Sequence, residues 1–219
     1  MKTVFAIALG VVVAISPASA QDYRVEVIDA APDADEISAE LAGVLHTEGY
    51  RVIRGTSRTV CEIWLTKNWE VTSDFEATQE RLYPLTQGQL LGVMHLPRRG
   101  KDFRDQSISS GWYTMRFALQ PVDGNHVGTS LTRDFVVLIE AEKDAPDKTW
   151  DPMALMMASA EAAGSTHPAM LCLQKSTESA EPAVRHNESL DWWILHVNGR
   201  NAQNGTVPFD LVVAGQALE

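Results

Sequence analysis

Apolar and polar residues alternate over many short stretches of this chain, as they do in strands that bury one face. In segment 59–65, Cys61, Ile63 and Leu65 fall on one face, with the residues between them on the other. A Gly-Thr-Ser turn separates this segment from 50–54, so we expect the two to pair as a hairpin. The pattern predicts strands at residues 23–28, 50–54, 59–65, 89–96, 112–120, 134–139, 169–174, 191–197 and 207–213.

Turn-forming residues separate the predicted strands, at Pro97-Arg-Arg-Gly, Ser110-Gly, Asp123-Gly, Asn198-Gly and Asn204-Gly. About eight short strands joined by such turns are typical of a mainly β protein built as an antiparallel β-sandwich. We therefore predict a single β-sandwich domain over residues 21–219, with two accessory helices.

The two helices are predicted by a change of periodicity. Residues at about 33–48 carry apolar side chains at helical spacing, preceded by Asp33 and Glu36 as a capping pair and followed by Gly49, which suits a C-terminal cap. The second helix is predicted at about 150–163, with an Asp-Pro pair at its start. We expect the first helix to pack one face on the main body of the protein.

Residues 1–20 have the three parts of an export signal. Lys2 supplies a positive start, residues 4–15 are apolar, and Ala18-Ser19-Ala20 is a small-residue cleavage site. The apolar run is shorter than the roughly 18 to 20 residues that cross a bilayer. We predict cleavage after Ala20 and a soluble mature chain, periplasmic or secreted, with no membrane span.

The charge balance narrows the range of partners. Without the leader, 17 basic and 29 acidic side chains remain, a net charge of −12. Such a chain repels phosphate backbones and anionic lipid surfaces, so we expect no nucleic-acid partner. The excess of carboxylates suits a solvated surface or a cationic ligand.

Cys61 and Cys172 are the two cysteines of the chain. In an oxidising compartment two cysteines suggest one disulfide, although a pair of buried free thiols is also ordinary. We predict a disulfide between Cys61 and Cys172 that links distant parts of the sandwich. There is no Cys-x-x-Cys pair, so nothing points to a thioredoxin-type redox role.

Segment 119–135 places many polar groups between two apolar runs. As a calcium loop it fails at Val127, which has no side-chain oxygen, and its flanks are predicted strands rather than helices. Asp123-Gly124 is a strong hairpin signal, since glycine accepts the positive φ of such turns. A turn explains most of the stretch without a function, but it leaves His126 unexplained. We therefore predict a hairpin connection that carries His126 as a local ligand-binding residue.

A metal site would have to be assembled by folding, because no two histidines have the close spacing of a metal pair. The metal-ligating candidates are His95, His126 and His167. A copper or zinc ion is the cofactor that such a site implies, and a protein without a cofactor is the competing prediction. Met153, Met156 and Met157 could add soft ligands for copper, but their spacing predicts the buried face of a helix.

Motifs of common enzymes are missing from the sequence. It contains no G-x-S-x-G elbow, no H-E-x-x-H pair, no phosphate-binding loop and no dinucleotide fingerprint. The six tryptophans leave a carbohydrate-binding module open, provided that exposed rings form a coplanar platform. Trp192 and Trp193 are neighbours in a predicted strand, so their rings are expected on opposite faces.

Three motifs resemble those of a group of uncharacterised exported bacterial proteins that are rich in β-structure. They are Gln120-Pro-Val-Asp-Gly-Asn-His126, Arg133-Asp-Phe135 and His167-Pro-Ala169. The similarity extends over most of residues 50–215. It implies export and a β-rich fold without implying a reaction, and it suggests that a function would lie at the motif residues.

Together these observations predict a non-catalytic binding or accessory module for a small molecule or a protein. The residues expected to hold the ligand are Asp123, Asn125, His126, Arg133, Asp134 and His167. Asp123 or Asn125 would orient the ring of His126. One alternative is a copper-type metal-binding protein or metal-dependent enzyme that uses His126 and His167; another is a carbohydrate-binding module.

Overall fold

The computed structural model describes residues 22–33, 35–121, 132–176 and 179–217. Within these ranges the chain is mainly β-structure with two α-helices. In chain order the elements are β1 (Tyr23–Asp29), α1 (Ala39–Val44), β2 (Glu48–Arg54), β3 (Arg58–Leu65), β4 (Leu90–Leu96), β5 (Gly100–Lys101), β6 (Ser107–Ile108), β7 (Gly111–Leu119), β8 (Asp134–Glu140), the 3-10 helix η1 (Ala141–Lys143), α2 (Pro152–Ala162), β9 (Met170–Gln174), β10 (Ala183–Asn187), β11 (Trp192–Arg200) and β12 (Thr206–Ala214).

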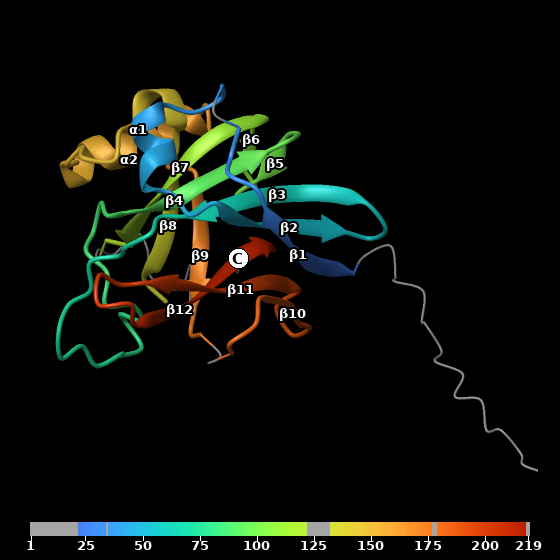
Figure 1. Ribbon diagram of the computed structural model, residues 1–219. Coiled ribbons are helices and arrows are strands. Elements are labelled where there is room, and N and C mark those ends of the chain that lie inside the picture. The colour runs from blue at the N-terminus through green and yellow to red at the C-terminus, as the bar shows by residue number, and fades with distance from the viewer. Residues whose placement is uncertain (1–21, 34, 122–131, 177–178, 218–219) are drawn as a thin grey trace, which may run out of the picture.

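Ten strands form one antiparallel sheet that curves into a nearly closed barrel (Figure 1). The strand order is β1-β2-β3-β4-β7-β8-β9-β12-β11-β10, and β5 and β6 form a separate two-stranded sheet. The edge strands β1 and β10 lie against each other, and the rings of Tyr23 and Trp193 meet across this seam with centroids 4.8 Å apart. Among the described residues no hydrogen-bonded ladder joins the two edges.

The predicted mainly β, antiparallel character is confirmed, but the eight-stranded sandwich is wrong. The reason is that closure depends on strands far apart in the chain, since β9 pairs with β12 and β1 meets β10. The alternation of apolar and polar residues within a strand shows which face of the sheet each residue occupies. It does not show which distant strand pairs with that strand. The pairing of 50–54 with 59–65 is local, and it is confirmed as the β2–β3 hairpin.

The two faces of the sheet are the inside and the outside of the barrel. Cys61, Ile63 and Leu65 of β3 point inward, as their alternation predicted, and join the main apolar core. Between them, Glu62 and Trp64 point outward, where Trp64 packs under α1. Strand β8 is buried on both faces, because its outer residues are covered by α2.

Helix α1 is shorter than predicted. Ser38, not Asp33, is its N-cap and accepts a hydrogen bond from the amide of Leu41. Gly49 is not a C-terminal cap; it lies in β2, where a Cβ atom would come within 2.5 Å of the indole of Trp64. The glycine is needed for this close approach. The expectation that the helix packs one face on the main body is confirmed, with Leu41 fully buried against Trp64 and Val93.

Helix α2 begins as predicted and buries a different face from the one expected. The side chain of Asp151 caps it and accepts hydrogen bonds from two backbone amides. Of the three methionines only Met156 packs against this face, because Met153 and Met157 are 69% and 63% exposed. Leu155 points to β8 instead, so the helix register is set by a leucine rather than by the methionine spacing.

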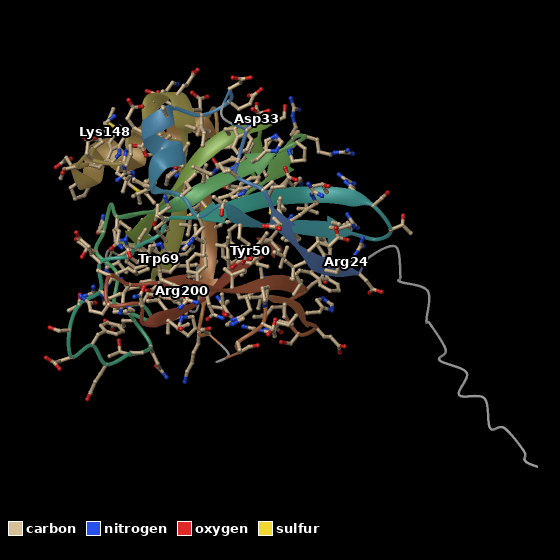
Figure 2. All side chains as sticks on the ribbon, in the orientation of Figure 1. Arg24, Asp33, Tyr50, Trp69, Lys148 and Arg200 are labelled. Atoms are coloured by element: carbon tan, nitrogen blue, oxygen red, sulfur yellow. The ribbon has the colours of Figure 1, made fainter. Side chains whose placement is uncertain are left out.

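One end of the barrel is closed by the segment 66–89, which crosses it as a long loop (Figure 1). Trp69 and Tyr83 from this segment are buried in the main core, and the indole of Trp69 donates to the carbonyl of Leu91. Figure 2 shows Trp69 and Arg24 toward opposite ends of the barrel. The interior is therefore blind at the end where Trp69 lies.

In the part of the chain that the structure describes, no helix has the length and apolar character that crossing a membrane requires.

The approach of Gly49 to Trp64 predicts a destabilising substitution. We expect Gly49→Ala to lower the free energy of unfolding by about 1–3 kcal/mol, because the added methyl overlaps the indole. Gly43→Ala in α1 is the matched control. Its Cβ would meet nothing within 4 Å, so it should be neutral or stabilise by about 0.5–1 kcal/mol. Urea denaturation of both variants measures the difference, and equal effects would contradict the packing argument.

Candidate functional site

The open end of the barrel contains a cavity of about 460 Å³, here called the mouth cavity. Its walls come from both sides of the barrel, since β3 and β4 face β9 and β12 across it. The wall residues are the inward-facing side chains nearest this end, and they are Cys61, Met94, Leu96, Ile108, Leu138, Leu171 and Val213. Because the other end is closed by segment 66–89, the cavity has one entrance.

Five basic side chains line this cavity on the side formed by β2, β3 and the β4–β5 turn, and we call them the rim cations. They are Arg54, Arg58, Arg98, Arg99 and Lys101. Among the residues lining the cavity there is no aspartate or glutamate, although the whole chain has 29 acidic and 18 basic side chains. The mouth cavity is therefore a local positive region on an acidic protein, with apolar walls behind it.

The side chains nearest the entrance carry little chemical reactivity of their own. Burial raises the pKa of the Cys61 thiol to about 12, so it is a neutral, weakly nucleophilic group. Burial likewise raises the pKa of the Tyr23 phenol, which keeps it uncharged. No histidine lines the mouth cavity.

Sequence reasoning missed this site. Arg98 and Arg99 belong to Pro97-Arg-Arg-Gly, which the pattern marks only as a turn, and Arg58 is next to another turn. The three come together because the ends of β3 and β4 meet at the barrel mouth. The adjacent arginines Arg98 and Arg99 could have been noticed in the sequence. They indicate a binding site only together with the apolar wall behind them, which the sequence does not reveal.

The chain matches no protein-family model, no curated protein and no solved structure. Its function has to be argued from its own residues.

The predicted ligand-binding residues are placed only in part. Asp123, Asn125 and His126 lie outside the described residues, so their role stays a prediction. The strands on either side of them, β7 and β8, do pair in antiparallel register as expected. Arg133 donates from Nε to the carbonyl of Gln120 at 2.9 Å, which joins the two strand ends.

Asp134 is fully buried at the closed end of the barrel. Its carboxylate accepts hydrogen bonds from the amides of Leu82 and Tyr83, at 2.9 and 3.1 Å. Burial raises its pKa, against the lowering effect of these two bonds. Both oxygens are occupied in anchoring segment 66–89, so the structure gives Asp134 a role in closing the barrel.

His95 lies on the outer face of β4 in a well-defined setting. Its Nδ1 is 2.8 Å from Glu62, and its ring stacks on Trp112 with centroids 4.5 Å apart. Burial raises the pKa of Glu62, but the hydrogen bonds from His95 and Arg51 outweigh it and hold that pKa below its usual value. Glu62 is thus an acceptor, which places the ring proton of His95 on Nδ1.

His167 lies elsewhere, in the connection after α2. It lines a cavity of about 250 Å³ together with Met153, Met156 and Met170. This cavity and the one that His95 lines have no residue in common. Among the described residues no three His, Cys, Asp or Glu side chains are grouped to hold a metal ion. The predicted metal role, which requires His126, stays a prediction.

Three of the six tryptophans are buried in the core and three are partly exposed. Trp64, Trp69 and Trp192 are buried. Trp112 is stacked under His95, Trp193 lies between His186 and Tyr23, and Trp150 has the ammonium of Lys148 at 3.6 Å from its ring centroid. The carbohydrate-binding alternative, which requires a coplanar exposed platform, stays a prediction.

A buried cluster on β11 and β12 has the residue types of a catalytic triad without its geometry. His196 Nδ1 lies 2.5 Å from Asp210, and Ser176 Oγ donates to the same carboxylate at 2.7 Å. In a triad the serine would instead face Nε2, but that nitrogen contacts the carbonyl of Ser179 at 3.0 Å. The cluster holds the connection before β10 against the barrel.

A second polar cluster, Arg116 with Asp144, is also structural. Arg116 makes two bonds to the carboxylate of Asp144 and donates to the carbonyls of Gly88, Ala145 and Lys148. All five of its donors are used, so it has none left for a ligand. Burial would raise the pKa of Asp144, but the bonds from Arg116 and Thr114 outweigh it and hold that pKa below its ordinary value.

The buried pair predicts a pH-dependent loss of stability. We expect Asp144→Asn to cost about 3–5 kcal/mol at pH 7, because Arg116 then keeps a buried charge without a counter-ion. Since the pKa of Asp144 is lower in the folded state, its contribution is complete above about pH 4 and is lost as the pH falls further. Urea unfolding at pH 7 and pH 3 should show the gap to wild type narrowing. Asp147→Asn, on the exposed part of the same loop, should change little.

The predicted disulfide is wrong, because Cys61 and Cys172 are both buried and no disulfide joins them. Cys61 points into the barrel and Cys172 points out of it, under Phe103 and Trp192. Strands β4, β7 and β8 separate the two strands that carry them. A spacing of residues cannot reveal that two side chains lie on opposite faces of a sheet.

Free thiols predict a simple chemical result. Protein purified without reductant should show two alkylatable thiols after unfolding in denaturant, and slow alkylation of Cys61 while folded, because its thiol is buried and neutral. Mass spectrometry of the alkylated chain measures both. A chain that needs prior reduction to gain two adducts would contradict the structure.

Proposed function

We propose that this chain is a non-catalytic binding protein that holds the apolar part of a small molecule in the mouth cavity. The observation that carries the proposal is a blind, apolar cavity at one end of the barrel, closed at the other end by segment 66–89. A volume of about 460 Å³ falls within the range of roughly 300–1,000 Å³ that is typical of ligand sites.

The chemistry of the cavity supports binding rather than catalysis. Its lining residues include no histidine, aspartate or glutamate, so no side chain there can serve as a general base at neutral pH. Cys61, the one thiol in the wall, is neutral, because burial raises its pKa to about 12. A bound molecule would therefore be sheltered from water without being transformed.

The predicted leader at residues 1–20 fits this role. An exported carrier would keep a poorly soluble molecule in solution in the periplasm or outside the cell, and the net negative charge of the mature chain would keep the carrier itself soluble. Burial of the ligand's apolar surface would supply most of the affinity, at about 25 cal/mol per Å² removed from water before the cost of ordering the ligand.

Filling the mouth cavity should abolish binding. Val213→Trp places an indole at the wall of the cavity, so it should weaken binding of the neutral fluorescent probe N-phenyl-1-naphthylamine by about tenfold or more. Val27→Trp is the matched control, because Val27 is 52% exposed and lines no part of the cavity. A fluorescence titration measures both, with circular dichroism to verify folding. Absence of saturable binding to wild type, or equal binding by Val213→Trp, would refute the proposal.

A further inference from the structure

We infer that the ligand of the mouth cavity is an anionic amphiphile, a molecule with a negatively charged head on a single apolar chain. This inference rests on the proposed function and adds the chemical class of the ligand. It is carried by the rim cations at the entrance of an apolar cavity: the head would lie at the entrance while the chain enters the barrel.

Three of the rim cations have no hydrogen-bond or ion-pair partner among the described residues. Arg58, Arg98 and Arg99 are exposed, and in the described ranges no hydrogen bond or ion pair engages their guanidinium groups. The remaining two are engaged, since Lys101 pairs with Asp105 and Arg54 lies over the ring of Tyr23. Unengaged guanidinium groups are available to bind a carboxylate or phosphate in a two-bond geometry.

The carboxylates near the entrance do not neutralise the positive charge of the rim cations. The carboxylate of Asp105 accepts hydrogen bonds from the ammonium of Lys101 and from the side-chain amide of Gln216. Asp191 is bonded to His186 on the outer side of the seam. Neither carboxylate lines the cavity, so a molecule at the entrance meets the three free arginines first.

The shape of the site favours a free amphiphile over a membrane surface. A basic patch that binds a membrane uses exposed cations alone, whereas here the cations line one side of an apolar cavity with buried walls. The remainder of the acidic chain repels an anionic bilayer. A single chain that leaves water, with its charged head held at the rim, satisfies both parts of the site.

The test compares ligands that share a chain and differ in the head. Dodecanoate, dodecyl phosphate, dodecanol and dodecyltrimethylammonium, each below its micelle-forming concentration, would displace N-phenyl-1-naphthylamine from the purified protein. We expect the two anions to bind about tenfold or more tightly than dodecanol, and the cation to bind most weakly, because charge-assisted hydrogen bonds at the rim act on the anions alone. Raising the salt concentration should narrow this gap, since the rim is exposed. Tighter binding of dodecyl phosphate than of dodecanoate would identify a phosphate head.

Substitutions of the rim arginines test whether these residues cause the preference for anionic ligands. The double variant Arg98→Gln with Arg99→Gln, and separately Arg58→Gln, should weaken the anions severalfold and leave dodecanol within about twofold. Arg200→Gln is the matched control, because Arg200 is an exposed arginine that does not line the cavity.

The outcomes separate this inference from the proposed function. Equal binding of dodecanol and dodecanoate, unchanged by the arginine variants, would overturn the inference and leave the proposed function standing. Absence of binding by every probe, including N-phenyl-1-naphthylamine, would overturn both. Sedimentation with phosphatidylglycerol vesicles that is lost in the arginine variants and kept in Val213→Trp would also overturn the inference, because it would show a membrane contact that does not use the cavity.

Discussion

The anchoring of segment 66–89 across one end of the barrel determines what the rest of the interior can do. Asp134 holds two backbone amides of that segment, and the indole of Trp69 bonds to a carbonyl of β4's second residue. Because side chains fill that end, the interior of the barrel is a cavity open at one end and not a channel. A cavity with one entrance can remove a ligand from water, while a channel open at both ends would let water reach the ligand from either side.

The local parts of the fold could be predicted from sequence, and the global shape could not. Alternation within β3 showed which residues face inward, and the Asp151 cap marked where α2 begins. These features depend on neighbours in the chain. Closure of the barrel depends on the contact between β10 and β1, which lie near opposite ends of the chain. Strand β10 alternates only weakly and was not predicted. Gly49 was misread for the same reason, because its partner, Trp64, comes from another strand.

The candidate site was harder to predict than the fold, because its two parts are distant in sequence. The walls are ordinary core residues such as Leu171, and a core residue next to a cavity has the same sequence pattern as one in a filled core. The rim arginines Arg98 and Arg99 occur in a turn, where exposed charge is unremarkable. Polar residues that attracted notice for their chemistry, such as Asp134, proved to stabilise the fold.

The seam between β1 and β10 has a consequence for how the protein avoids aggregation. Two strand edges meet there without a ladder, and unpaired edges can recruit a strand from another molecule. Here the ring of Trp193 stacks on His186 and meets the ring of Tyr23 at a tilt, and Arg54 lies over Tyr23. These contacts hold the two edge strands against each other, which leaves less room for an incoming strand. The same aromatic contact that completes the barrel therefore guards its two open edges against pairing with another copy of the chain.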